Sequence, residues 1–205
     1  SLDREAHVAR DAQGDTYRYR RLLLATGATP RRLGFDGGER LIHYRTLADY
    51  EALRRYAIPG AHVAVIGGGF IGSELAASLC GIGCKVTMLF PGKSIGAGRY
   101  PDGLCAYLDA YYREHVIELR AGTKVTGGRA VDGGVELELS AGETLRVDAV
   151  VAGIGVTPDT TLAEQAGLAV DNGIVVDAQL RSSDADIWAA GDVANFHSVA
   201  LDRRL

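Results

Sequence analysis

The chain has 205 residues, a formal net charge of −4 and a hydrophobic fraction of 47%, which allows one large domain or two small ones. No apolar run reaches the roughly 20 residues that a transmembrane helix needs, so the sequence excludes such a helix. The negative net charge gives no reason to expect nucleic-acid binding.

The residues before position 61 read as strands, turns and one helix. Residues 5–25 predict two short strands around a turn at 11–15, and the second strand continues through Leu22 to Ala25, an apolar run that suits a strand buried on both faces. Glycine and proline end it at 26–30. A glycine-rich loop to about residue 40 follows, and a helix is predicted between Leu47 and Tyr56.

The most informative stretch is HVAVIGGGFIGSELAASL, residues 62–79. A strand over 62–66 leads into Gly67-x-Gly69-x-x-Gly72, and an apolar helical face follows, as the fingerprint of a dinucleotide-binding turn requires. The three glycines permit a tight turn, close approach of a pyrophosphate and close helix–strand packing, respectively. Gly68, Phe70 and Ile71 complete the predicted binding turn. We expect Gly81 and Gly83 to end the helix, and residues 86–90 to form the next strand.

The segment after that strand, Phe90-Pro91-Gly92-Lys93, lacks the acidic residue that usually binds the adenosine ribose. Two alternatives follow. Lys93 or Arg99 meets a 2′-phosphate, which favours NADPH, or backbone and water hold the ribose, which favours NADH. The family resemblance set out below favours NADH.

The remaining pattern completes an α/β fold. A helix follows Pro101-Asp102, with Leu104, Tyr107, Leu108 and Tyr111 as its apolar face, and a third strand at 116–119 completes a βαβαβ unit. A β-meander is predicted from strands at 123–126, 129–139 and 143–148, and a buried strand at 149–152 follows. A helix at 159–166 and strands at 173–177 and 186–190 end the series. The fold class is therefore a Rossmann-like NAD(P)-binding domain with a β-meander.

The three cysteines, Cys80, Cys84 and Cys105, are an odd number without a C-x-x-C pair, which is typical of free thiols in a reducing compartment. We expect them to be buried and structural. The histidines stand singly among unrelated neighbours, so no metal site is assigned.

Three landmarks stand in one order: Ala25-Thr26-Gly27, the GGGFIGSE stretch, and Ala190-Gly191-Asp192. This order resembles the FAD-dependent pyridine nucleotide–disulfide oxidoreductase superfamily, in which an NAD(P)H domain is inserted into an FAD domain. The segments that start at Gly67, Leu89 and Trp188 are most similar to the apoptosis-inducing factor type of NADH:flavin oxidoreductase. The resemblance implies partial FAD-binding segments at 1–45 and 160–205 and an NAD(P)H-binding domain at 46–159.

The resemblance also implies roles for individual residues. Thr26 and Gly27 would lie by the FAD, and Asp192 would bond its ribityl chain; alternatively these residues form a strand exit and a helix N-cap. Phe70 would pack on the nicotinamide, or be a core aromatic. Glu74 would point to the flavin side and order a lysine, or be a carboxylate in the first helical turn that the helix dipole favours. Gly153 and Gly155 would let a loop approach the nicotinamide.

The activity implied is that of a flavin-dependent NAD(P)H oxidoreductase, in which hydride passes from the nicotinamide to FAD and electrons pass to a quinone, a ferredoxin, oxygen or a partner protein. The alternative is an NADH-responsive binding module with little turnover and a change of oligomeric state, such as a homodimer. No other GxGxxG stands in the chain, so we expect this fragment alone to bind FAD poorly. The expected location is cytoplasmic, or mitochondrial in a eukaryote.

Overall fold

The computed structural model describes residues 1–204, and they form two compact units. The inserted unit is Pro30–Gly155, and the flanking unit combines Ser1–Thr29 with the segment that starts at Val156. The first boundary differs from the predicted 45/46 because residues 41–43 form a strand of the inserted unit's sheet. The second lies at 155/156 instead of the predicted 159/160. The assignment of the units to two coenzymes stays a prediction.

A five-stranded, fully parallel sheet forms the centre of the inserted unit. Its order is β6 (Leu41–His43), β13 (Ala149–Ala152), β7 (His62–Ile66), β8 (Lys85–Phe90) and β9 (Glu118–Ala121). From β7 the chain proceeds outward to β8 and β9 and later returns to β13 on the other side. The order therefore reverses at β7, which is where open parallel sheets bind ligands beyond their carboxyl ends. The predicted α/β class is confirmed.

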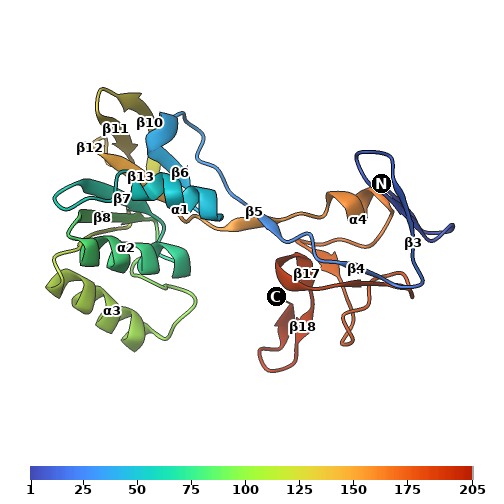
Figure 1. Ribbon diagram of the computed structural model, residues 1–205. Helices are drawn as coiled ribbons and strands as arrows, with labels where there is room; N and C mark the ends of the chain where they lie inside the picture. The colour runs from blue at the N-terminus through green and yellow to red at the C-terminus, as the bar shows by residue number, and fades with distance from the viewer. Residues whose placement is uncertain (205) are drawn as a thin grey trace. The chain divides into compact units, whose positions relative to one another are not determined.

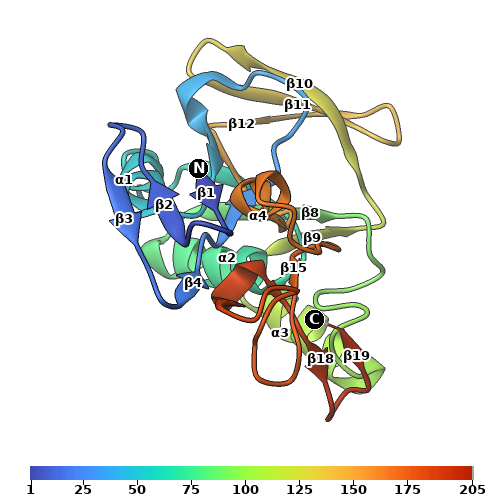
Figure 2. The ribbon, with the colours of Figure 1, turned by 90° about the vertical axis from the view of Figure 1, so that its right-hand side faces the viewer.

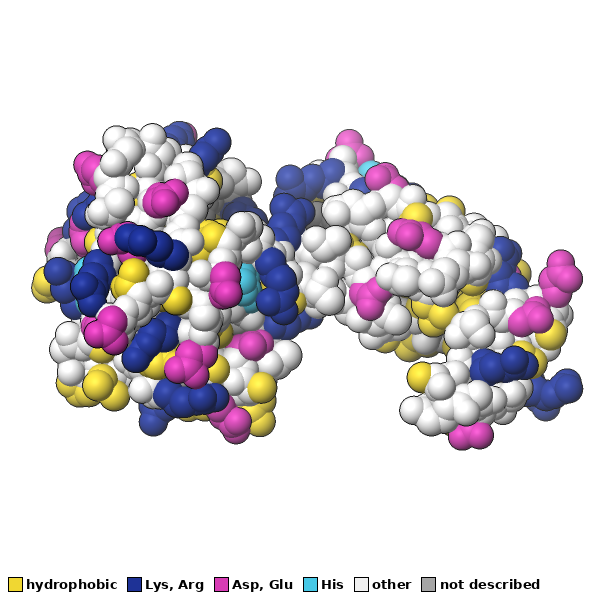
Figure 3. Space-filling model, turned by 90° about the horizontal axis from the view of Figure 1, so that it is seen from above, with side chains coloured by type: hydrophobic (Ala, Val, Ile, Leu, Met, Phe, Trp, Pro, Cys, Tyr) yellow, Lys and Arg dark blue, Asp and Glu magenta, His cyan; other side chains and the backbone are white. Residues whose placement is uncertain are grey.

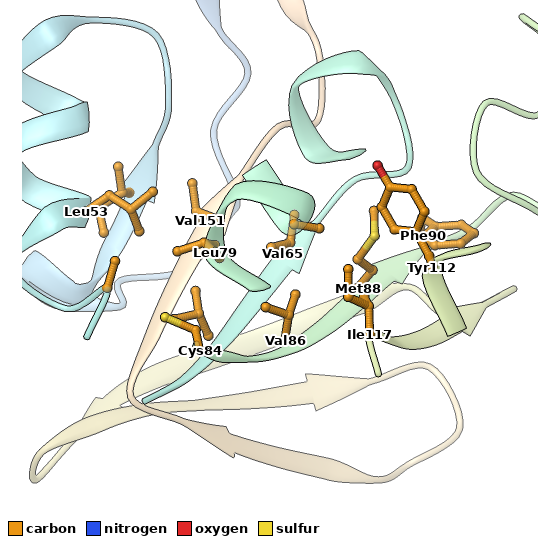
Figure 4. Close-up of a cluster of buried hydrophobic side chains, with 14 of the residues drawn as sticks. Leu53, Val65, Leu79, Cys84, Val86, Met88, Phe90, Tyr112, Ile117 and Val151 are labelled. Carbon is orange, nitrogen blue, oxygen red and sulfur yellow. The ribbon is translucent and has the colours of Figure 1, made fainter. Parts of the chain in front are cut away.

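Helices cover one face of this sheet (Figure 1): α1 (Leu47–Arg54), α2 (Phe70–Ile82) and α3 (Asp102–Glu114). Figure 4 shows the resulting core, in which Val65, Val86 and Met88 of the strands pack with Leu79 of α2 and Tyr112 of α3. Val65 and Met88 are completely buried. Each such side chain contributes about 1.5–3 kcal/mol through removal from water.

An antiparallel sheet covers the other face, with strands β10 (Val125–Val131), β11 (Gly134–Leu139) and β12 (Thr144–Val147). Val135, Leu137 and Leu139 of β11 pack on Ala64 and Leu89. The single predicted strand 129–139 is wrong because the chain turns at Gly133, whose φ is +69°.

Two element boundaries also differ from the prediction. Gly81 does not end α2, which continues to Ile82 and ends at Gly83, a left-handed C-cap with φ +96°. The third strand starts at Glu118 instead of residue 116, because Val116 is a connecting residue with φ +62° and lies exposed. The left-handed conformation is typical of glycine and rare for valine. A valine at this position therefore did not indicate a turn in the sequence.

The predicted apolar face of α3 is wrong for three of its four residues. Leu104, Tyr107 and Tyr111 are exposed, whereas Leu108 is half-buried against the core. The buried residues of α3 are Cys105, Asp109 and Tyr112. Asp109 is buried because its Oδ1 accepts a hydrogen bond from the Ile95 amide at 2.9 Å. A satisfied polar group can thus occupy a core position that an apolar pattern does not reveal.

The flanking unit is built from short strands. β1 (Leu2–Asp3), β2 (Val8–Arg10) and β3 (Thr16–Arg18) form an antiparallel sheet. β4 (Leu22–Leu24) runs parallel to β16 (Ile187–Ala189). The other elements are β5 (Ala28–Pro30) paired with β14 (Val156–Pro158), α4 (Thr161–Gln165), β15 (Ile174–Val175) parallel to β17 (Ala194–Asn195), and the β18 (His197–Ser198) and β19 (Arg203–Arg204) hairpin seen in Figure 2.

Strand β4 is not buried on both faces as predicted. Leu24 belongs to the core with Ile187, but Leu23 is 58% exposed. Successive side chains of a strand point to opposite faces, so Leu24 faces the core while Leu23 lies on a face that the described residues leave exposed.

The cysteines are free thiols: Cys84 and Cys105 are buried as predicted, and Cys80 is half-buried. Each thiol donates to a backbone carbonyl. In the described part of the chain no three His, Cys, Asp or Glu side chains group as a metal site would require. No helix among these residues has the length and apolar character needed to cross a membrane.

His43 makes the stability of the inserted unit depend on pH. Its Nε2 accepts a hydrogen bond from the Leu33 amide at 3.0 Å, and burial, with the nearby Arg32, lowers the pKa of His43 below 6.5. The unfolded chain therefore binds a proton before the folded one does. The free energy of unfolding should fall as the pH drops below about 6.5. Urea denaturation between pH 5 and 8 measures this.

The matched variant is His43→Gln, whose side-chain oxygen can accept the same hydrogen bond without titrating. In this variant the free energy of unfolding should fall less at acid pH, because position 43 no longer takes up a proton. A smaller decline should remain from His62, since burial lowers the pKa of His62 as well. Identical pH profiles for the wild type and the variant would contradict this account.

Candidate functional site

Three glycines bring backbone segments into direct contact at the carboxyl end of β7. A Cβ on Gly67, where φ is +122°, would collide with the carbonyl oxygen of Gly153. A Cβ on Gly72 would collide in the same way with the carbonyl oxygen of Gly67. The ends of β7 and β13 and the start of α2 can approach this closely only because Gly67 and Gly72 lack side chains.

Gly68 and Gly69 complete the turn. A Cβ on Gly68 would lie 2.9 Å from the ring of Phe90, and the Gly68 carbonyl accepts a hydrogen bond from the Gly96 amide at 2.8 Å. Gly69 is the N-cap of α2 and has an extended backbone. A Cβ there would meet only the Arg99 guanidinium, at 3.7 Å, so Gly69 leaves open space above the helix.

The N-terminus of α2 fits an anionic group. The first amides of a helix have no intrahelical partner, Gly69 offers no side-chain cap, and no acidic residue stands in the first turn. Amides and helix dipole together favour a phosphate at such a position. Arg99 adds a positive charge beside Gly69. This cradle fits the pyrophosphate of a dinucleotide.

Glu74 does not lie in the first turn, as the sequence suggested, because α2 begins at Phe70 and Glu74 is its fifth residue. The helix-dipole interpretation of Glu74 is therefore wrong, since that effect is confined to the first turn. Its side chain is exposed.

Phe70 is not a core aromatic. Its side chain is 57% exposed at the first position of α2, and its ring contacts Tyr100 edge-on, with centroids 5.7 Å apart. Ile71, the next residue, is half-buried and lies against Gly153, where a Cβ would be 3.1 Å from its side chain.

The loop that follows β8 folds back over the glycine turn through the Gly96–Gly68 hydrogen bond. It carries Lys93 and Arg99, but the two cations are engaged differently. Arg99 lies beside Gly69, whereas Lys93 forms an ion pair with Asp102, Nζ to Oδ1 3.0 Å. This hydrogen bond and the Asp102 charge raise the pKa of Lys93.

Gly153 and Gly155 follow β13, next to β7 in the sheet. The Gly153 amide donates to the Ile66 carbonyl at 2.8 Å, and the Gly155 carbonyl accepts from the Arg31 amide at 3.0 Å. Gly155 has φ +99°. The structure thus brings both glycines to the same sheet edge as the glycine turn.

The landmarks of the flanking unit also share an edge. Thr26 and Gly27 follow β4, Gly191 and Asp192 follow β16, and these two strands are parallel neighbours. The Thr26 hydroxyl donates to the Asp159 carbonyl at 2.6 Å, so it links the segment after β4 to the segment after β14. Asp192 is not an N-cap: it lies within the short 3-10 helix Gly191–Val193, whose N-cap is Ala190.

Sequence reasoning missed Asp102, Tyr100 and Gly96 as parts of the site. Pro101-Asp102 was recognised as a helix start, but nothing local linked Asp102 to Lys93. Figure 3 shows Lys and Arg interspersed with Asp and Glu on the face turned to the viewer.

Known proteins with similar sequences identify the family of this chain. Residues 1–203 match the family model described as pyridine nucleotide-disulphide oxidoreductase. The chain is 39% identical over 207 residues to the ferredoxin–NAD(+) reductase component of the anthranilate 1,2-dioxygenase system of Burkholderia cepacia, covering 100% of this chain and 51% of the relative. It is 36% identical to a rubredoxin-NAD(+) reductase of Pseudomonas putida, over 95% of this chain and 51% of that protein.

The fold matches solved structures equally well. Putidaredoxin reductase, in its covalent complex with putidaredoxin, superposes with a TM-score of 0.94 at 35% identity, covering 100% of this chain and 51% of that one. The chain thus spans about half the length of the relatives it matches. The apoptosis-inducing factor likeness stays a prediction. The glycine turn at the switch point, the paired edges of the flanking unit and the match over residues 1–203 agree, and the chain belongs to the pyridine nucleotide-disulphide oxidoreductase family.

Proposed function

We propose that the inserted unit binds NAD(H) along the carboxyl edge of its parallel sheet, as part of a flavin-dependent NAD(P)H oxidoreductase. The observation that carries this proposal is the backbone contact among Gly67, Gly72 and Gly153. It brings the α2 N-terminus to the switch point of the sheet with an open glycine, Gly69, above it. A pyrophosphate needs amides, a dipole and free space, and this turn supplies all three.

Individual residues then take different parts of the coenzyme. The amides from Gly69 to Gly72 receive the pyrophosphate, and Arg99 adds charge to it. Gly153 and Gly155, on the neighbouring strand end, leave room for the nicotinamide half. Phe70 is exposed at the turn and offers its ring to the nicotinamide, while Glu74 lies one turn further along α2.

The flanking unit contributes to the flavin site in this proposal. Thr26, Gly27 and Asp192 stand at the carboxyl ends of two adjacent parallel strands, the edge at which such sheets receive nucleotides. When both coenzymes are bound, the nicotinamide supplies a hydride that the flavin accepts. The protein's residues orient the two coenzymes and exclude competing reactions.

The electron acceptor is proposed to be a small redox protein of the ferredoxin or rubredoxin class, and NADH is the proposed coenzyme. The support comes from the relatives, whose names specify ferredoxin or rubredoxin and NAD(+). A cytoplasmic location is part of the same proposal.

The glycine turn is tested by Gly69→Glu. The Gly69 backbone suits any residue and a Cβ would meet no atom closer than 3.7 Å, so the variant should fold, losing at most about 1 kcal/mol at the N-cap. The new carboxylate would repel the pyrophosphate, and the NADH dissociation constant should rise about tenfold or more. Calorimetric titration of the wild-type and variant chains with NADH measures this change.

The matched control is Gly34→Glu, which adds the same carboxylate at another open glycine of the inserted unit. It should leave NADH affinity unchanged. Equal NADH affinity in the Gly69 variant and the wild type, or failure of the wild type to bind NADH, would contradict the proposed binding site.

The place of Phe70 is tested by Phe70→Ala. Because the ring is largely exposed, its removal should cost little stability, yet it should weaken NADH binding about fivefold through lost ring packing. Binding of ADP-ribose, which lacks the nicotinamide, should not change. An equal loss for NADH and ADP-ribose would show that Phe70 does not contact the nicotinamide. Tyr107→Ala removes another exposed aromatic, outside the glycine turn, as the control.

The redox step is tested on the full-length protein with FAD bound. Anaerobic NADH should bleach the oxidised flavin absorbance, and added ferredoxin or rubredoxin should restore it faster than a quinone or oxygen does. Reoxidation that is faster with a quinone would exclude the proposed acceptor class. Tight NADH binding with slow bleaching and a change of oligomeric state would instead favour an NADH-responsive module.

A further inference from the structure

The loop after β8 contains no carboxylate, although the adenosine ribose of a dinucleotide usually meets an acid at this strand end. Phe90 ends β8 and is buried, and residues 91–101 include neither Asp nor Glu. Any acidic group beside the ribose position must therefore come from another element.

Asp102, the first residue of α3, is an acidic residue that directly follows this loop. Its Oδ1 lies 3.0 Å from Lys93 Nζ, and both side chains face solvent, with exposures of 84% for Asp102 and 73% for Lys93. A carboxylate is favourable at a helix N-terminus. A ligand that binds beside the loop after β8 can therefore reach both Lys93 and Asp102.

The two cations of this loop have separate surroundings. The Arg99 guanidinium lies over Gly69, at the position of the pyrophosphate in the proposed site. Lys93 is closer in sequence to the end of β8, where the adenosine ribose is expected. Of the loop's cations, Lys93 is therefore the one that a 2′-phosphate would require, and its charge is offset by Asp102.

We propose that Asp102 is a specificity-determining residue that favours NADH over NADPH, by holding Lys93 in an ion pair and by adding a negative charge beside the ribose position. The inference rests on the proposed NAD(H) site. A ribose diol can donate hydrogen bonds to a carboxylate, whereas a 2′-phosphate is repelled by it. Lys93 alone would attract the phosphate; Lys93 paired with Asp102 has no net charge.

The test is Asp102→Asn, which removes the charge but keeps the shape of an exposed side chain. Dissociation constants for NADH and NADPH are measured by fluorescence titration at low and high salt. The ratio of the NADPH constant to the NADH constant should fall about fivefold at low salt, since exposed ion pairs act on this scale. The change should shrink at high salt because the charges are screened.

Two variants separate the cause. Asp102→Asn combined with Lys93→Ala should remove most of the gain in NADPH affinity, because the released cation is absent. Glu114→Gln removes an exposed carboxylate at the other end of α3 and should leave the ratio unchanged. Circular dichroism of each variant checks that α3 remains folded.

The outcomes distinguish this inference from the proposed function. If the wild type binds both coenzymes and Asp102→Asn leaves their ratio unchanged, the role of Asp102 is wrong while the nucleotide site stands. If the gain persists in full without Lys93, the ion pair is not its cause, and the proposed part of Lys93 is wrong. If the wild type binds neither coenzyme, the proposed site fails, and the inference about Asp102 fails with it.

Discussion

The close backbone contact among Gly67, Gly72 and Gly153 is the constraint on which the candidate coenzyme site depends. A single methyl group at Gly67 or Gly72 would meet a carbonyl oxygen, so β7, β13 and α2 can meet only in the absence of side chains. This contact fixes the N-terminus of α2 over the edge of the sheet. Well-packed backbone cannot yield to such an intrusion without moving the elements that carry it.

The remaining site geometry is built outward from this turn. The carbonyl of Gly68 receives the Gly96 amide, which ties the loop after β8 to the turn. Arg99 consequently lies beside Gly69, and Lys93 meets Asp102. The charge of Arg99 thus lies beside the turn, whereas the charge of Lys93 is offset by Asp102. This distribution is the basis of the proposed preference for a dinucleotide whose ribose carries no phosphate.

Local patterns predicted the elements whose signal lies in consecutive residues. The strand 62–66 and the start of α2 are where the glycine spacing indicated. Strand β6 was missed because it is three residues long and is stabilised by pairing with β13, about a hundred residues later in the chain. The face of α3 was misassigned because Asp109 and Tyr112 are buried through hydrogen bonds to Ile95 and Ser73. The ion pair of Asp102 likewise depends on a loop conformation that no periodicity encodes.

The connection between the two units explains how an insertion of this size leaves the flanking strands intact. Strands β4 and β16 pair directly although the whole inserted unit separates them in sequence, and the entering and leaving segments β5 and β14 also pair. Chain ends held side by side allow a domain to be inserted with little loss of neighbouring structure. The leaving segment runs from Gly153, at the glycine turn, to Asp159, which bonds both Thr26 and Gly27. One short stretch of chain therefore joins the edge proposed for the nicotinamide coenzyme to the edge proposed for the flavin.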